Sequence, residues 1–249
     1  MPTQQQDRLI VPPVNTSLAS KILAVQAANR IAYWKLDEAS GTSAVDSSPT
    51  GANGVYTSTF TLDQNGVGDG SRSTLFAGGR VSLATNLGLI DTAIGNKSAG
   101  TIFVACQVTN IGVWTDATIR GIFHIGTDAN NHIFINKNNT SNQVILSHRA
   151  GGTVKTVSSV SLSFVTFFTV CLTWDKAADQ VIGYINGIPQ SAPLTGLGTY
   201  VGTLGSGFSA IADSSSSGSQ PYAGWLSHVV LWKVALTPAE VASLFLARI

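Results

Sequence analysis

The chain reads Tyr33-Trp34-Lys35-Leu36-Asp37-Glu38-Ala39-Ser40-Gly41-Thr42 near its start, then Ala44-Val45-Asp46-Ser47-Ser48 and, after a turn, Asn53-Gly54-Val55-Tyr56. Aromatic and apolar residues alternate in the first run, and small polar residues then break it. This pattern predicts a half-buried first strand that turns across the end of a β-sandwich.

The composition narrows the class of protein. Of the 249 residues, 44% are hydrophobic and 11% are charged, so one large sandwich has an ample core and few salt bridges. A net charge of +1, with Lys and Arg scattered along the chain, argues against nucleic-acid binding. No apolar run approaches the roughly 20 residues that span a bilayer, and the polar start has no signal-peptide pattern. We therefore expect no membrane insertion and no signal peptide.

Short β-like runs, separated by Gly, Asn and Ser turns, fill the chain from Ile31 to Val234. Two of the runs carry apolar residues at alternate positions, namely Ile102, Val104, Cys106 and Val108 in the first and Phe168, Val170, Leu172 and Trp174 in the second. This period predicts one buried face in each strand. The pair Asn186-Gly187 predicts a tight hairpin, and Cys106 and Cys171 are expected to be buried thiols without a disulfide.

The two ends of the chain differ from this β pattern. Residues 1–15 are expected to form an extended arm whose assembly residues are Leu9, Ile10, Val11, Pro12 and Pro13, because paired prolines exclude a helix there. The apolar triplet would add to a sheet edge of another subunit. Residues 16–30 are expected to form a short helix, and residues 31–249 the sandwich. The sandwich closes on a short C-terminal helix, because Thr237 and Glu240 stand at capping-box spacing.

The opening stretch resembles the first strand of laminin-G-like domains in the concanavalin A-like lectin/glucanase superfamily. Three later segments resemble strands of that family in the same order, namely Leu75–Val81, Thr101–Val104, and Phe168–Asp175 followed by Ile182–Gly187. The resemblance covers roughly residues 31 to 248 and implies an all-β fold, a concanavalin A-like jelly-roll β-sandwich. It implies no single function, because that superfamily contains sugar binders, adhesion modules, enzymes and structural parts.

The closing motif departs from the family pattern, since Ser227 and His228 stand where an acidic pair is common. Calcium prefers several oxygen ligands with carboxylates among them, so the loss of this acidic pair argues against a calcium site of the family type. Asp46 and Asn53 could still supply oxygens, although turn formation is the favoured role for both. We expect no metal or other cofactor and leave open a residual calcium site near Asp46.

Candidate catalytic groups are scarce. A retaining glucanase needs two carboxyl groups about 5 Å apart, but of the two glutamates Glu240 caps a helix and Glu38 lies beside Asp37 on a strand. Asp175 and Asp179 are expected to be turn residues. The four histidines show no zinc-type spacing. The sequence therefore predicts a protein that is not an enzyme, with a glycan hydrolase as the least favoured alternative.

Glycan binding remains open as an alternative. The candidates for stacking on a sugar are the aromatic residues near Gly- and Asn-rich segments, namely Trp114, Tyr200, Tyr222 and Trp225. For each of these residues, burial in the core is the favoured alternative.

The sparse charges, the absence of a signal peptide and the arm ahead of a rigid β-module favour a bacteriophage virion part, a capsid decoration or tail-associated protein. Its expected partners are other virion or capsid proteins and copies of itself, and its expected location is the virion. A carbohydrate-binding adhesin that contacts cell-surface glycans is the alternative from another class.

Overall fold

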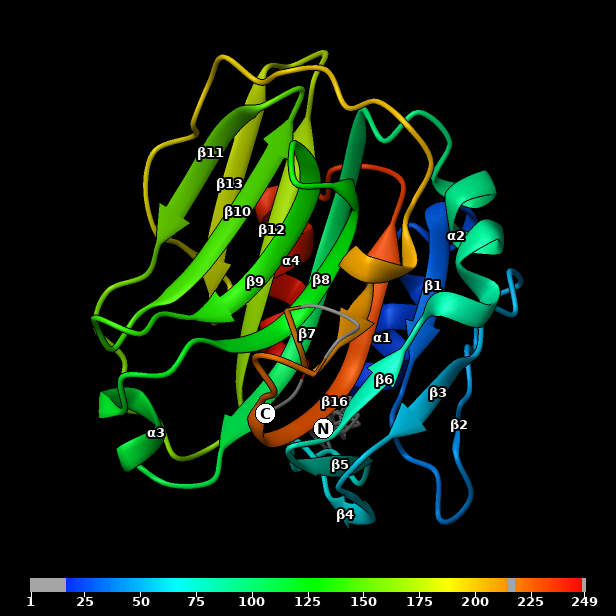
Figure 1. Cartoon of the computed structure of the whole chain (residues 1–249), viewed down its shortest axis with the longest axis vertical. Coiled ribbons are helices and arrows are strands. Elements are labelled where there is room, and N and C mark those ends of the chain that lie inside the picture. The colour runs from blue at the N-terminus through cyan, green and yellow to red at the C-terminus, as the bar shows by residue number, and fades with distance from the viewer. Residues whose placement is uncertain (1–16, 215–217, 248–249) are drawn as a thin grey trace, which may run out of the picture.

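The computed structural model describes residues 17–214 and 218–247, and in these ranges the chain forms two facing antiparallel sheets (Figure 1). The predicted all-β sandwich with a short helix at each end is confirmed. None of the helices in these ranges is long and apolar enough to cross a membrane. The predicted arm lies outside the described residues.

One sheet, here called the helix-backed sheet, has β16 near its centre. In spatial order its strands are β14 (Ile188–Pro189), β13 (Gln180–Ile185), β12 (Phe168–Asp175), β7 (Ala99–Val108), β16 (Ala223–Trp232), β5 (Arg72–Ala77) and β4 (Phe60–Asn65). The first strand of the chain, β1 (Arg30–Trp34), pairs with the second half of β16, and β5 pairs with its first half. Since β7 also pairs with β16, this one strand joins β1, β5 and β7, which are far apart in sequence.

The other sheet is here called the open sheet. In spatial order its strands are β11 (Thr153–Ser158), β10 (Val144–Ala150), β9 (Asn131–Lys137), β8 (Arg120–Asp128), β15 (Ala210–Ile211), β6 (Arg80–Ser82), β3 (Gly54–Thr57) and β2 (Ser43–Ala44). Short helical segments connect the strands, namely α2 (Leu87–Ile94), α3 (Gly112–Thr115), η1 (Ala27–Asn29), η2 (Ala84–Asn86) and η3 (Ser206–Phe208).

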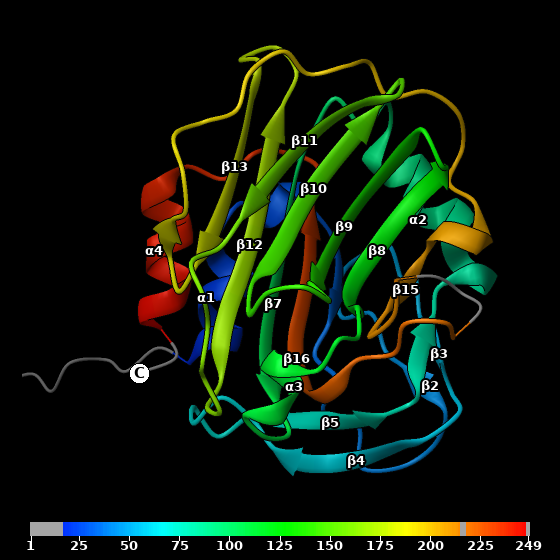
Figure 2. The same ribbon diagram turned by 60° about the vertical axis from the view of Figure 1, so that its left-hand side comes forward.

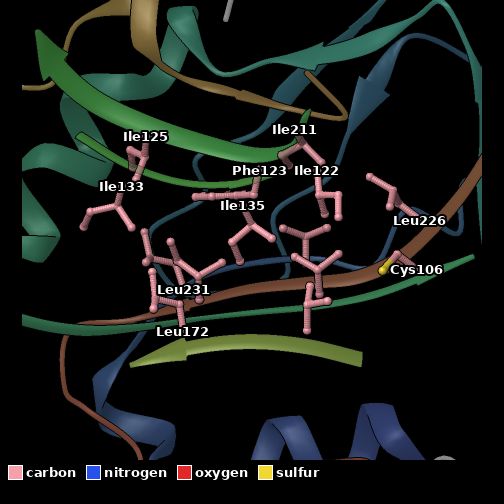
Figure 3. Packing of buried hydrophobic residues seen from close by; sticks show 14 of the residues in the cluster. Cys106, Ile122, Phe123, Ile125, Ile133, Ile135, Leu172, Ile211, Leu226 and Leu231 are labelled. Atoms are coloured by element: carbon pink, nitrogen blue, oxygen red, sulfur yellow. The ribbon is translucent and has the colours of Figure 1, made fainter. Parts of the chain in front are cut away.

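The main core lies between the two sheets, as Figure 3 shows. Phe123, Ile133 and Ile135 of the open sheet face Leu172 and Leu231 of the helix-backed sheet. The alternating residues predicted for β7 and β12 all belong to this core, so that prediction is confirmed.

A second apolar cluster lies on the other face of the helix-backed sheet. There α1 (Leu18–Ala24) and α4 (Pro238–Leu246) cover outward-pointing residues such as Phe103, Tyr184 and Trp232. Figure 2 shows both helices behind this sheet and none in front of β9 to β11. Cys106 belongs to the main core and Cys171 to the second, so the buried thiols face opposite ways and no disulfide joins them in the described chain.

The two end helices are capped as local sequence predicts, but one is shorter than expected. Ser17 caps α1 by accepting a hydrogen bond from the Ser20 amide, and Thr237 and Glu240 form the full capping box of α4. The N-terminal helix ends at Ala24 rather than near Asn29, because Gln26 has a left-handed backbone with φ of 45°. A single 3₁₀ turn then leads into β1.

Candidate functional site

The outer surface of β8, β9 and β10 is here called the open face, and six residues define it: His124, His132, Phe134, Ser147, Arg149 and Phe208. Side chains alternate along a strand, so these strand residues point away from the core residues between them. His124 pairs with Phe134 across β8 and β9, and Phe134 pairs with Ser147 across β9 and β10. His132 pairs with Arg149 in the next row.

Four aromatic rings pack together on this face. The ring centroids of His124 and His132 are 5.2 Å apart, and those of His132 and Phe134 are 5.4 Å apart. Phe208 lies 5.7 Å from His124 by the same measure, although 84 residues separate them in sequence. His132, Phe134 and Phe208 are only partly buried. The open face therefore offers accessible aromatic surface.

The connection between β14 and β15 brings Phe208 onto the open face. The Gly205 amide donates a hydrogen bond to the Gly126 carbonyl over 2.8 Å, which holds the chain against the end of β8. Nearby, a side chain at Gly121 would overlap the backbone of Asp213 and Ser214, so glycine lets that loop lie directly on β8.

Three ring or guanidinium nitrogens on the open face lack hydrogen-bond partners among the described residues: His124 Nε2, His132 Nδ1 and Arg149 Nε. His124 Nδ1 contacts the Ser214 carbonyl, which can only accept, so Nδ1 carries the proton and Nε2 is left as an acceptor. Arg149 Nε is a donor, while its Nη1 donates to the Ala129 carbonyl over 2.7 Å. An unmet acceptor and an unmet donor thus lie buried just beneath the open face.

Both histidines of the open face are neutral near pH 7. Burial lowers the pKa of His124 to about 4 against the opposing effect of its Ser214 contact. The pKa of His132 is also lowered, first by burial and then by the positive charge of Arg149. A neutral imidazole has one hydrogen-bond donor and one acceptor, so this face suits a ligand whose groups can both donate and accept hydrogen bonds.

The four aromatic residues that the sequence singled out do not come together here. Trp114, Tyr200 and Tyr222 are buried in the main core, and the Trp114 indole donates to the Phe164 carbonyl over 2.7 Å. Trp225 is partly buried but lies in the helix-backed sheet. Burial removes the ring faces of the first three from solvent, which is the alternative that the sequence favoured for them.

Sequence reasoning missed the open face, although part of a signal was present. In β9, the run His132-Ile133-Phe134-Ile135 alternates with period two, which places both His132 and Phe134 opposite the core isoleucines. The spacing of the four histidines along the chain excludes only a zinc-type motif and does not show that two of them meet on one face. Phe208 gave no signal, because its neighbours on the open face lie on strands distant in sequence.

The carboxylates considered for metal binding or catalysis have structural partners. Asp46 accepts hydrogen bonds from the amides of Tyr33, Ser48 and Ala52 and from the Ser48 hydroxyl, at 2.8 Å each. Glu38 accepts from the Tyr56 hydroxyl and the Val45 amide. Residues 17–214 and 218–247 contain no group of three or more His, Cys, Asp or Glu side chains placed to hold a metal ion.

The fold defines a two-sheet, all-β sandwich with one open and one helix-covered outer face. Residues 89–242 match the model of the concanavalin A-like lectin/glucanases superfamily, and the chain belongs to that family. No curated protein matches the sequence significantly.

Solved structures with this fold include carbohydrate-associated proteins. Domain 4 of an extracellular GH43 arabinanase from Geobacillus stearothermophilus, in complex with arabinotriose, has a TM-score of 0.64 at 14% identity, over 87% of this chain and 98% of that one. The CBM40 of an IT-sialidase from Ruminococcus gnavus, bound to α2,3-sialyllactose, has a TM-score of 0.51 at 17% identity. That match covers 63% of this chain and 87% of the CBM40.

A Trypanosoma rangeli sialidase has a TM-score of 0.62 at 14% identity over 88% of this chain, but the match spans only 32% of the sialidase. At these identities the likeness shows the fold alone. The chain is thus a concanavalin A-like module that resembles carbohydrate-binding domains.

Proposed function

We propose that this protein is a non-catalytic carbohydrate-binding module whose binding surface is the open face. The observation that carries the proposal is the partly exposed aromatic cluster with unmet hydrogen-bonding nitrogens, on the face of the sandwich that no helix covers. Further support comes from the fold neighbours that were solved in complex with arabinotriose and with sialyllactose.

Sugars match this surface chemically. The C–H groups of a pyranose or furanose ring can pack on Phe134 and Phe208, and aromatic contacts of this kind contribute about 1 kcal/mol beyond the area that they bury. A sugar hydroxyl both donates and accepts, so it can pair with the His124 acceptor and the Arg149 donor. Each buried polar group without a partner costs about 1–3 kcal/mol, which favours a small rotation of His132 that lets the ligand reach these nitrogens.

The proposal includes no catalysis. The glutamates Glu38 and Glu240 serve the opening loop and the C-terminal cap, and neither belongs to the open face. Incubation with laminarin, agar, alginate and peptidoglycan should therefore release no reducing ends. This part of the proposal would be wrong if the protein turned over one of these substrates and a single Asp→Ala substitution abolished that turnover.

Glycan-array screening followed by calorimetry tests the binding site. Phe134→Ala and Arg149→Ala should each weaken the best glycan at least tenfold with unchanged far-UV circular dichroism. The matched control is Ile188→Ala, which truncates an exposed apolar residue of the helix-backed sheet. The proposed site is wrong if Trp225→Ala abolishes binding while Phe134→Ala has no effect.

A role as a phage capsid decoration or tail-associated protein stays a second hypothesis. It rests on the sparse charges and on the sequence of residues 1–15, which lie outside the described residues, and the comparisons give no sign of a phage origin. Deleting residues 1–15 should leave the melting temperature nearly unchanged while oligomers or particle binding are lost. A truncated chain that assembles as well as the full-length one would remove the basis of this hypothesis.

A further inference from the structure

A small cavity lies at one end of the sandwich, away from the open face. It has a volume of about 90 Å³, and its walls come from the α2–β7 connection, β10, the β12–β13 turn and the segment after β14. The residues that line it are Asn96, Lys97, Ser98, His148, Lys176, Gly198, Thr199 and Tyr200. A protein cavity of about 150 Å³ holds benzene, which has six heavy atoms, so this cavity has room for a group of about four heavy atoms.

His148 is the most buried polar group in this wall. It is 2% exposed, and its ring lies 5.9 Å from the Trp174 ring, centroid to centroid. Its Nδ1 has no hydrogen-bond partner in the part of the chain that the structure describes. Burial lowers the pKa of His148 to about 4 against the opposing effect of a hydrogen bond with its own backbone, and the nearby charge of Lys176 acts in the same direction as burial. An anionic partner would offset the effect of Lys176.

Two lysines beside the cavity, Lys155 and Lys176, share the nearby negative charge of Asp179. Lys176 is exposed, and its ammonium donates to the Leu197 carbonyl at the rim. Lys155 pairs with His148 across β10 and β11. No carboxylate of the described residues lines the cavity, and Asp179 nearby accepts hydrogen bonds from the Gly196 and Leu197 amides at 2.8 Å each.

Lys97 lines the cavity, but its ammonium group already has partners and is not available to a ligand. Its ammonium lies 2.7 Å from Asp91 Oδ1 and donates to the Gly95 and Gly202 carbonyls over 3.1 and 3.3 Å. The pair of Lys97 and Asp91 is therefore internally neutralised. The donors left for a ligand are the Lys176 ammonium and the His148 imidazole.

We infer that this cavity binds a small carboxylate of about the size of acetate. One carboxylate oxygen accepts from the Lys176 ammonium and the other from the His148 imidazole, while the carbon end packs beside the Tyr200 ring. Thr199 and Ser98 complete a polar rim. The site is separate from the open face and does not depend on the proposed glycan binding.

Acetate and its neutral isostere acetamide test this inference on the full chain by NMR of the histidine ring signals. Acetate should shift the His148 signals saturably and raise the pKa of His148 by more than one unit, and acetamide should do neither. Equal shifts with both compounds, or no saturable shift with acetate, would overturn the inference. The comparison needs no variant, so a folding defect cannot obscure it.

Lys176→Gln adds a second test, because this side chain is exposed and its loss should leave the fold intact. It should weaken acetate binding at least tenfold, whereas Lys233→Gln, an equal change of charge at an exposed site on another part of the chain, should leave it unchanged. Equal weakening by both variants would show that net charge alone attracts acetate. Saturating acetate should not change glycan affinity at the open face, which separates the two proposals.

Discussion

The two outer faces of the sandwich differ in what covers them. On the helix-backed sheet, outward residues such as Phe103, Val230 and Trp232 are fully buried beneath α1 and α4. On the open sheet, Phe134 and Arg149 remain partly accessible. A strand with apolar residues on both faces needs a second cover, whereas a face of aromatic and polar residues tolerates water. The uncovered face is thus the one whose chemistry is available to a ligand.

Truncating one aromatic residue on each face should give the largest difference. Trp232→Ala removes a fully buried ring whose indole also donates to the Val25 carbonyl over 3.1 Å, so we expect a loss of about 3–5 kcal/mol in the free energy of unfolding. Phe134→Ala should cost about 1 kcal/mol, because its ring is already partly in water. Urea unfolding measures both. Equal losses would mean that the open face is a structural surface as well.

Acid should distinguish the buried His228 of the helix-backed sheet from the partly exposed His132 of the open face by a smaller amount. Burial lowers the pKa of His228, which lies beside α1 in the helix-backed sheet, to about 4, against the opposing effect of Asp69. The unfolded state, with a pKa near 6.5, then binds more protons than the folded state, so the stability that neutral His228 contributes is complete above pH 6.5 and falls as pH drops toward 4.

His228→Asn should reduce this pH dependence by up to about 1.4 kcal/mol per pH unit, as urea unfolding between pH 7 and pH 4.5 would measure. Asparagine suits the backbone there, since His228 has φ of 52°. The control is His132→Asn on the open face, where the ring is partly exposed and the slope should change less. A slope that neither variant alters would assign the acid sensitivity to other groups.

Calcium should have the smallest effect, on either face. The oxygens of Asp46 already accept four hydrogen bonds, which leaves them poorly placed for a cation. Millimolar calcium should therefore shift the melting temperature by less than about 1 °C. A ligand at 100 times its dissociation constant would add about 2.7 kcal/mol, so a rise of several degrees that chelator reverses would reveal a site.

Local signals in the sequence were sufficient to predict the strands and helices but not to predict the open face. The alternation of Ile102 with Val104 and the spacing of Thr237 and Glu240 act within one strand or one helical turn, so the sequence predicted them correctly. The end of α1 was missed because Gln26 adopts a backbone that few non-glycine residues take.

The neighbours of a residue across a sheet are set by pairing over long sequence distances. His124 meets Phe208 only because the chain after β14 returns over the β8–β9 turn. The burial of Trp114 depends in the same way on Phe168 and on the Phe164 carbonyl, about 50 residues later in the chain. No periodicity encodes such contacts, so the sequence could nominate aromatic residues but not choose among them.

The central place of β16 has a consequence for biosynthesis. β7 lies on one side of this strand and both β1 and β5 on the other, so residues 223–232 connect segments that leave the ribosome much earlier. Until that strand is synthesised, the helix-backed sheet exists only as separate pieces, and contacts so distant in sequence form slowly. We therefore expect the nascent chain to reach its native structure only once residues 223–232 have left the ribosome, and to expose the incomplete sheet until then.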